Sequence, residues 1–174
     1  MTNHQPRTLF DFGSTASEDA WTSTDDVIMG GVSSSALHIQ PEGIAVFEGD
    51  LSLERGGGFA SVHAELPGAN LSAYNGLEMR VRGDGRRYRA RLRAAPESTP
   101  VTYHASFETE PGVWESVRLP FESFKPRFHG RWVPDAPPLD VENITSFGWL
   151  VADKQAGHFR LEIDWVRAYA GDGP

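Results

Sequence analysis

The stretch LEMRVRGDGRRYRARLR, residues 77–93, decides the fold of this chain. On both sides of its Gly-Asp-Gly centre, apolar residues alternate with charged ones. A period of two residues is that of a β-strand with one face buried and the other in water. Glycines between two such runs are typical of a tight turn. The stretch therefore predicts a β-hairpin whose apolar face packs on a core.

The same alternation, interrupted by glycine and proline, recurs along most of the chain. Residues 147–152 are apolar at nearly every position, which predicts a central strand covered on both faces. No segment has a convincing helical period, and many short strands separated by turns are typical of sandwiches and jelly rolls. We therefore expect one all-β domain over residues 1–174, an antiparallel jelly-roll β-sandwich. The predicted strands are residues 45–53, 59–64, 77–82, 87–93, 102–107, 114–119, 147–152 and 159–169.

Composition excludes several classes of function. The chain has 174 residues, a formal net charge of −8 and no cysteine. An acidic chain is a poor non-specific binder of nucleic acid or of anionic membranes. The lack of cysteine excludes disulfides, a thiolate nucleophile and cysteine-ligated metals. No apolar run reaches the ~20 residues that span a bilayer, and the N-terminus lacks the pattern of a secretory signal, so we expect a cytoplasmic location.

Residues 21–35, WTSTDDVIMGGVSSS, have neither a helical nor a strand period. Their acidic pair and glycine pair are typical of a shaped loop, and such loops often carry function. In the alternative interpretation, a tryptophan and a methionine of this segment close one end of the core. The candidate binding residues of the segment are Trp21, Asp25, Asp26, Met29, Gly30, Gly31 and Ser33.

Seven of the sixteen basic residues are arginines gathered within residues 80–93. Alternation would place most of them on one face of the predicted hairpin. Such a face could bind an acidic protein segment, a phosphate or a sugar acid, because a guanidinium group matches two oxygens at once. Alternatively, acidic residues of neighbouring strands, such as Glu108, Glu115, Glu162 and Asp164, pair with these arginines. The candidate binding residues here are Arg80, Arg82, Arg87 and Arg89.

Signatures of catalysis and of metal binding are weak. The Gly-Asp-Gly turn lacks the spacing of a phosphate-binding loop, and residues 31–34 lack the second glycine of a nucleophile elbow. The histidines show no metal-binding spacing, and we expect His63 and His104, within predicted strands, to face solvent. Asp25 and Asp26, beside backbone carbonyls, could hold Ca²⁺, but two carboxylates fall short of the roughly 6–8 oxygen ligands that this ion takes. We predict no cofactor and no metal ion.

Several blocks of the chain, taken in order, resemble the complex I intermediate-associated protein 30 family. In the first block, Ile28 is inserted between two residues that are usually adjacent in the family. The resemblance implies a galactose-binding-domain-like jelly roll, and its mitochondrial relatives assist assembly of respiratory complex I. Because no mitochondrial presequence is evident, we expect a bacterial-type, cytoplasmic version. The blocks include Trp21, Asp25 to Val27, Met29 to Gly31, Phe47 to Gly49, Gly58 to Ser61, Tyr74 to Leu77, Arg80 to Tyr88, Asp153 to Gln155 and Phe159 to Asp164.

Three functions remain in view, and the oligomeric state is left open. The leading hypothesis is a non-catalytic interaction module with a protein partner, such as an assembly factor. The second is a carbohydrate-binding module, for which Trp132 is the best sugar platform, while Trp149 and Trp165 are expected to be buried. Trp132 lies within residues 120–141, a predicted long loop with five prolines. The third is a jelly-roll hydrolase or lyase, which needs titratable groups that converge in one pocket.

Overall fold

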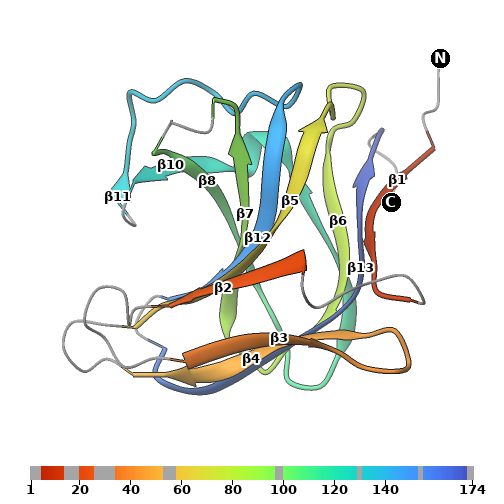
Figure 1. Ribbon diagram of the computed structural model, residues 1–174, viewed down its shortest axis with the longest axis vertical. Coiled ribbons are helices and arrows are strands. Elements are labelled where there is room, and N and C mark those ends of the chain that lie inside the picture. The colour runs from red at the N-terminus through yellow and green to blue at the C-terminus, as the bar shows by residue number, and fades with distance from the viewer. Residues whose placement is uncertain are drawn as a thin grey trace.

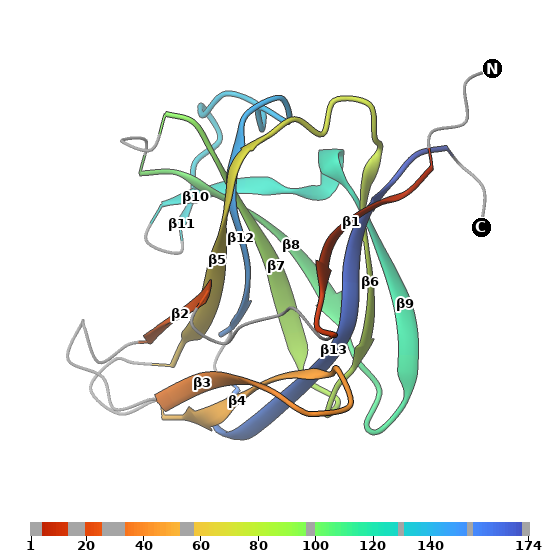
Figure 2. The same cartoon turned by 45° about the vertical axis from the view of Figure 1, so that its right-hand side comes forward.

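The computed structural model describes residues 5–13, 20–25, 34–52, 58–96, 100–128, 131–152 and 155–171. Most of these residues form antiparallel strands in two stacked sheets, as predicted (Figures 1 and 2). Sheet A runs β3 (Ser34–Ile39), β4 (Ala45–Leu51), β13 (Gly157–Tyr169), β6 (Gly76–Arg82) and β9 (Trp114–Pro120), with β1 (Arg7–Asp11) paired to the end of β13. Sheet B runs β11 (Arg131–Trp132), β10 (Lys125–Phe128), β8 (Thr102–Glu108), β7 (Arg87–Ala94), β12 (Ile144–Val151), β5 (Ala60–Ala69) and β2 (Trp21–Asp25).

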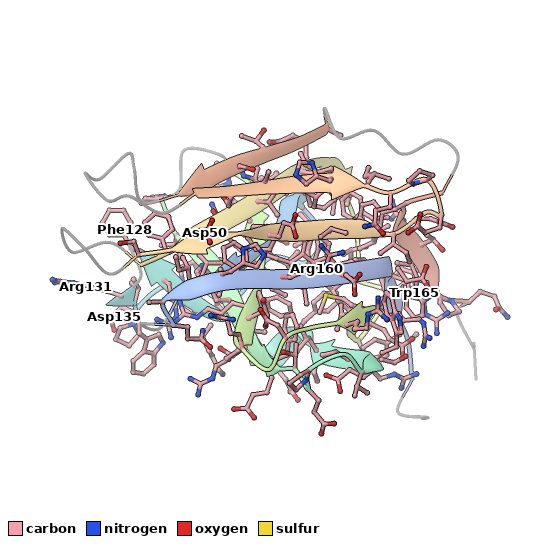
Figure 3. All side chains as sticks on the ribbon, turned by 90° about the horizontal axis from the view of Figure 1, so that it is seen from below. Asp50, Phe128, Arg131, Asp135, Arg160 and Trp165 are labelled. Atoms are coloured by element: carbon pink, nitrogen blue, oxygen red, sulfur yellow. The ribbon has the colours of Figure 1, made fainter. Side chains whose placement is uncertain are left out.

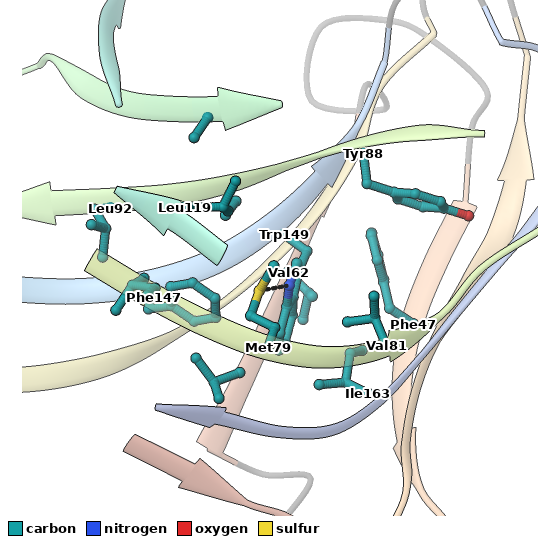
Figure 4. Packing of buried hydrophobic residues seen from close by; sticks show 14 of the residues in the cluster. Phe47, Val62, Met79, Val81, Tyr88, Leu92, Leu119, Phe147, Trp149 and Ile163 are labelled. Atoms are coloured by element: carbon teal, nitrogen blue, oxygen red, sulfur yellow. Dashed lines mark hydrogen bonds between the residues drawn. The ribbon is translucent and has the colours of Figure 1, made fainter. Parts of the chain in front are cut away.

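The core fills the space between the sheets with apolar side chains from strands of both layers (Figure 4). Strand β12 lies between β7 and β5 and is covered on both faces, as its apolar sequence predicts. Its Trp149 is fully buried, and the indole Nε1 donates a hydrogen bond to Sδ of Met79 across the core, at 3.3 Å. Buried aromatic rings of this size contribute much of the burial energy in such a core.

The predicted hairpin at residues 77–93 is wrong. Strand β6 belongs to sheet A and strand β7 to sheet B, so Gly83, Asp84 and Gly85 carry the chain from one sheet to the other. Alternation specifies which residues face the core, and it does so whether or not two successive strands pair with each other. A Gly-Asp-Gly turn is therefore compatible with both arrangements.

The Asp84 carboxylate holds this crossover in place. Its oxygens accept hydrogen bonds from the Tyr88 hydroxyl in sheet B, at 3.0 Å, and from the Arg160 backbone N–H in sheet A, at 2.8 Å. Thr109 secures the same turn, since its Oγ1 accepts from the Gly85 N–H at 3.1 Å and donates to the Arg86 carbonyl at 2.7 Å. The crossover is thus bonded to both layers of the sandwich.

Two further predictions are corrected by the fold. Residues 120–141 are not structureless, because they contain η4 (Phe121–Ser123), β10 and β11. Trp165 is only half-buried, although it was expected in the core. An irregularity in the pairing of β13 with β6 between Ile163 and Trp165 shifts the alternation, so that Val166 becomes the buried residue. Among the residues described, no helix is long and apolar enough to cross a membrane.

Candidate functional site

The candidate arginines lie on two different faces of the molecule. Arg80 and Arg82 are on the outer face of sheet A, whereas Arg87 and Arg89 are on the outer face of sheet B. The prediction of a single arginine face is therefore wrong, because β6 and β7 are in different sheets. The two faces differ in how their charges are balanced.

On sheet A the arginines are paired with acids of neighbouring strands. Arg82 donates two hydrogen bonds to Glu162, and Arg80 lies 3.4 Å from Asp164. Arg118 and Arg167 both donate to the buried Glu78, each at 2.8 Å. This is the paired arrangement that the alternative interpretation describes. Figure 3 shows the side chains of the same face, with Asp50 and Arg160 along it and Trp165 near one end.

These ion pairs keep the buried acids of sheet A ionised. Hydrogen bonds from Arg82 lower the pKa of Glu162 below its usual range, although burial opposes the shift. Burial also raises the pKa of Glu78, but hydrogen bonds from Arg118 and Arg167 outweigh this and leave it lowered. The cations and acids of sheet A thus stabilise one another, which gives Arg80 and Arg82 a structural role.

On sheet B, two histidines and an arginine lie in one row that crosses four strands, with a glycine between them. The strand register places His63 opposite Gly148, Gly148 opposite Arg91, and Arg91 opposite His104. Residues directly opposite in adjacent strands share a face of the sheet. Since side chains two positions apart also share a face, Arg89 and Arg93 flank Arg91 on this surface. We call Arg89, Arg91, Arg93, His63 and His104 the cationic face.

Arg91 lies at the centre of the cationic face, between Arg89 and Arg93. Burial, with the nearby charge of Arg93, lowers the pKa of Arg91. An arginine stays protonated even so. Within the described part of the chain, no hydrogen bond or ion pair joins Arg91 to an acid. On the same face, Glu65 lies opposite Ser146, which lies opposite Arg93, and its charge acts on His63. Glu108 lies 3.8 Å from Arg87.

His104 is buried, so the prediction that it faces solvent is wrong. Burial, reinforced by the charges of Arg89, Arg91 and Arg127, lowers the pKa of His104 to about 3. Its Nε2 lies 2.9 Å from Oγ1 of Thr102, and its Nδ1 has no hydrogen-bond partner among the described residues. Burial and the charge of Arg91 also lower the pKa of His63. Both histidines are therefore neutral near pH 7.

His104 predicts a loss of stability in mild acid. Its folded pKa lies below its unfolded value of about 6.5, so below that pH the unfolded chain binds a proton that the folded chain does not. The free energy of unfolding should be ~2 kcal/mol lower at pH 5 than at pH 7.5 from this residue alone. Urea unfolding at both pH values measures the difference, and His104→Gln should remove most of it. Glu78 and Glu162, whose pKa values are lowered, add their own loss only below about pH 4.5.

Trp132 is 64% exposed, as expected for a ligand platform. It lies opposite Arg127 in the β10–β11 pair, at the end of the molecule where Figure 3 shows Phe128, Arg131 and Asp135. Beside it is an open hollow of about 370 Å³. Its lining is rich in aromatic and proline side chains, among them Tyr103, Phe121, Phe124, Pro126, Pro134 and Pro137.

Trp21 packs against the core instead of forming part of a loop. Residues Trp21–Asp25 are strand β2, and Ser34 begins β3, so the prediction that residues 21–35 form no regular element is wrong at both ends. The Trp21 ring lies 5.2 Å from that of Trp149 and 4.9 Å from that of Phe10, between centroids. Asp25 lies opposite Ala60. The remaining candidates of this segment, Asp26, Met29, Gly30, Gly31 and Ser33, lie outside the described residues.

No group of three or more His, Asp or Glu side chains that could hold a metal ion occurs in the described ranges. Four acids of sheet A, Glu48, Glu78, Glu162 and Asp164, are engaged with arginines. His63 and His104 lie in different strands of sheet B among further arginines. The side chain with the clearest means of contacting a ligand is therefore Trp132, by its exposure.

The two stacked sheets define a galactose-binding-like β-sandwich of the kind found in carbohydrate-binding modules. The family 11 carbohydrate-binding module of a Clostridium thermocellum cellulase superposes with a TM-score of 0.74 at 17% identity, covering 98% of this chain and 97% of that one. A likeness at this identity shows the fold alone. The sequence goes further, because the complex I intermediate-associated protein 30 family matches residues 10–163. The chain belongs to that family.

Several relatives carry the family's name, among them a mouse and a fly protein. "Complex I intermediate-associated protein 30, mitochondrial" of Mus musculus is 29% identical over 95% of this chain, and its Drosophila melanogaster counterpart is 29% identical over 91%. The matches span 56% and 61% of those proteins. Both names point to the mitochondrion, so the prediction of a cytoplasmic location is wrong, and they give no support to a bacterial type.

Proposed function

We propose that this chain is a non-catalytic interaction module that binds protein partners during assembly of a respiratory complex of the complex I type. The family to which it belongs is named for association with complex I intermediates, and this supports the proposal. The observation that carries it is Trp132, a large ring left mostly in water beside an apolar hollow. Exposed aromatic side chains next to a pocket are typical anchors of protein interfaces.

Affinity capture with the tagged chain from detergent-solubilised mitochondria tests this function. We expect complex I subunits in the captured material, identified by mass spectrometry. Trp132→Ala should reduce their recovery at least tenfold without changing the melting temperature, because an anchor side chain carries a large share of the binding energy. Val113→Ala is the matched control, since Val113 is 43% exposed and is not among the residues lining the hollow. Equal recovery by both variants, or no complex I subunit with the unmodified chain, contradicts the proposal.

A carbohydrate-binding role is the second candidate, and Trp132 also favours it, because sugar rings stack on exposed aromatic faces. A family 11 module has been solved with a β-1,3-1,4-mixed-linked tetrasaccharide. Titration of the chain with this tetrasaccharide, followed by tryptophan fluorescence, separates the two functions. Saturable quenching that disappears in Trp132→Ala favours the sugar, and an unchanged spectrum favours the protein partner.

A further inference from the structure

We infer that the hollow beside Trp132 binds a proline-rich segment of a protein partner in the polyproline II conformation, with a basic residue of that segment seated on Glu122. The inference rests on the proposed function, because it specifies the chemistry of the partner that Trp132 anchors. Three features of the hollow support it: the rings that line it, a hydrogen-bond donor at its rim, and an acid that it shares with a second hollow.

The lining of the hollow is rich in flat and apolar rings. Aromatic-lined grooves are the surfaces on which proline-rich segments dock, because aromatic rings pack well against pyrrolidine rings. The lining therefore favours a proline-rich segment over a charged or glycine-rich one. The rings that line the hollow belong to Tyr103, Phe121, Phe124, Trp132, Pro126, Pro134, Pro137 and Pro138.

Hydrogen bonds hold the wall of the hollow in place before a ligand arrives. The Tyr103 hydroxyl donates to the Pro137 carbonyl at 2.6 Å, which ties the chain after β11 to β8. The Val133 N–H donates to the Pro126 carbonyl at 3.0 Å, and the Ala136 N–H donates to the Val133 carbonyl at 3.2 Å. A surface that is already ordered loses little entropy on binding, and a polyproline II ligand is itself preformed.

Trp132 offers a hydrogen bond as well as a ring. The residue is 64% exposed, and within the described ranges its indole Nε1–H has no acceptor. A polyproline II segment makes no internal hydrogen bonds, so its backbone carbonyls are available as acceptors. Such a segment can accept from the indole N–H while one of its prolines packs on the ring, and both parts of the side chain then contribute to binding.

Charge decides which residue accompanies the prolines. Glu122 lines the hollow beside Trp132 and also the second hollow, so the two share this residue. Its side chain is exposed, and it makes no hydrogen bond or ion pair with another of the described residues. In the second hollow, by contrast, Arg118 lies 2.8 Å from Glu78. A lysine or arginine of the segment would therefore meet an unengaged acid where the two hollows join.

Lys125 fixes the order of the contacts. This exposed cation lines the hollow beside Trp132 and is absent from the lining of the second hollow. Like charges repel one another, so a basic residue of the segment is disfavoured beside Lys125 and favoured at Glu122. The prolines then occupy the hollow beside Trp132, and the basic residue lies at the Glu122 end.

The test uses the full chain and a fluorescein-labelled peptide in which the sequence Pro-Pro-Leu-Pro-Arg occurs twice. A matched control peptide has glycine at every proline position and therefore carries the same charge. Anisotropy at low salt should show saturable binding of the proline peptide. The glycine peptide should bind at least tenfold more weakly, because it lacks the pyrrolidine rings and loses more conformational entropy when it becomes ordered.

Variants of two exposed residues test the two contacts separately. Trp132→Ala should weaken binding of the proline peptide at least tenfold, whereas Val113→Ala should leave it unchanged. Glu122→Gln should weaken it about threefold at low salt, as for an exposed ion pair, and should reduce the effect of added salt. Glu110→Gln is the control for charge, because Glu110 is exposed and lines neither hollow. It should leave binding unchanged.

Four results overturn the inference: no binding of the proline peptide, equal affinity for the two peptides, unchanged binding in Trp132→Ala or Glu122→Gln, or a dimer in sedimentation that Trp132→Ala abolishes. The last would assign the hollow to a second copy of the chain. If complex I subunits are captured through Trp132 while the peptide fails to bind, the proposed function stands and only this inference fails. If the peptide binds and no complex I subunit is captured, the proposed function fails and the chemistry of the hollow stands.

Discussion

Replacing Trp21 with alanine is expected to lower the free energy of unfolding by about 3–5 kcal/mol, the usual range for truncating a packed tryptophan. The ring is stacked on Trp149 with an interplanar angle of 18° and also contacts Phe10 and Phe12, so its loss opens a cavity at one end of the core. The melting temperature should fall by about 6–20 °C in a chain of this size.

The control for Trp21→Ala is a second tryptophan of opposite environment. Trp132→Ala removes the same atoms from a side chain that is 64% exposed, and its unfolding free energy should stay within about 0.5 kcal/mol of the unmodified chain. Thermal and urea unfolding of the two variants measures the difference between their unfolding free energies. Equal stability of both would mean that Trp21 contributes little to the core.

Asp84→Ala is expected to lower the free energy of unfolding by about 3–5 kcal/mol, a large effect for a residue in a turn. The change leaves the buried Tyr88 hydroxyl and the Arg160 backbone N–H without their acceptor, and each unsatisfied group costs about 1–3 kcal/mol. The remainder comes from the lost hydrogen bonds to Arg86. Urea unfolding measures the effect.

A double-mutant cycle isolates the hydrogen bond from the Tyr88 hydroxyl to the Asp84 carboxylate. In a Tyr88→Phe background the hydroxyl is absent, so Asp84→Ala should cost about 1–2 kcal/mol less than it does alone. Asp135→Ala, at an exposed position, should change stability by less than about 0.5 kcal/mol. Identical costs in the two backgrounds would show that the Asp84 carboxylate does not hold the two sheets together through Tyr88.

Sequence alone predicts most of the strands of this protein, because alternation depends only on neighbouring residues. Residues 147–152 are recognisable as a central strand, and Trp149 as a core residue, from their apolar character alone. Which strands pair with each other cannot be predicted from local alternation. Whether β7 follows β6 in the same sheet depends on contacts such as Asp84 with Arg160, which are 76 residues apart.

The candidate site is predictable in part for similar reasons. The abundance of arginine in residues 80–93 is visible in the sequence, but its division between two sheets is not. His104 is buried because β7 and β10 flank its strand, and the sequence around His104 does not indicate which strands are its neighbours. Trp165 was misassigned because a single bulge inverts the alternation that follows it. Trp132 was identified correctly as exposed, since it lies in a proline-rich segment without a strand period.

Pairing of β1 with the last part of β13 brings Arg7 opposite Ala168, so two points near opposite ends of the sequence are neighbours on sheet A (Figure 2). A purification tag or fluorophore fused before Arg7 or after Tyr169 therefore branches from one corner of the sandwich. That corner belongs to the layer opposite the cationic face. Immobilisation through a group attached at that corner would leave the face of sheet B turned toward the solution, which suits surface-based binding measurements on this protein.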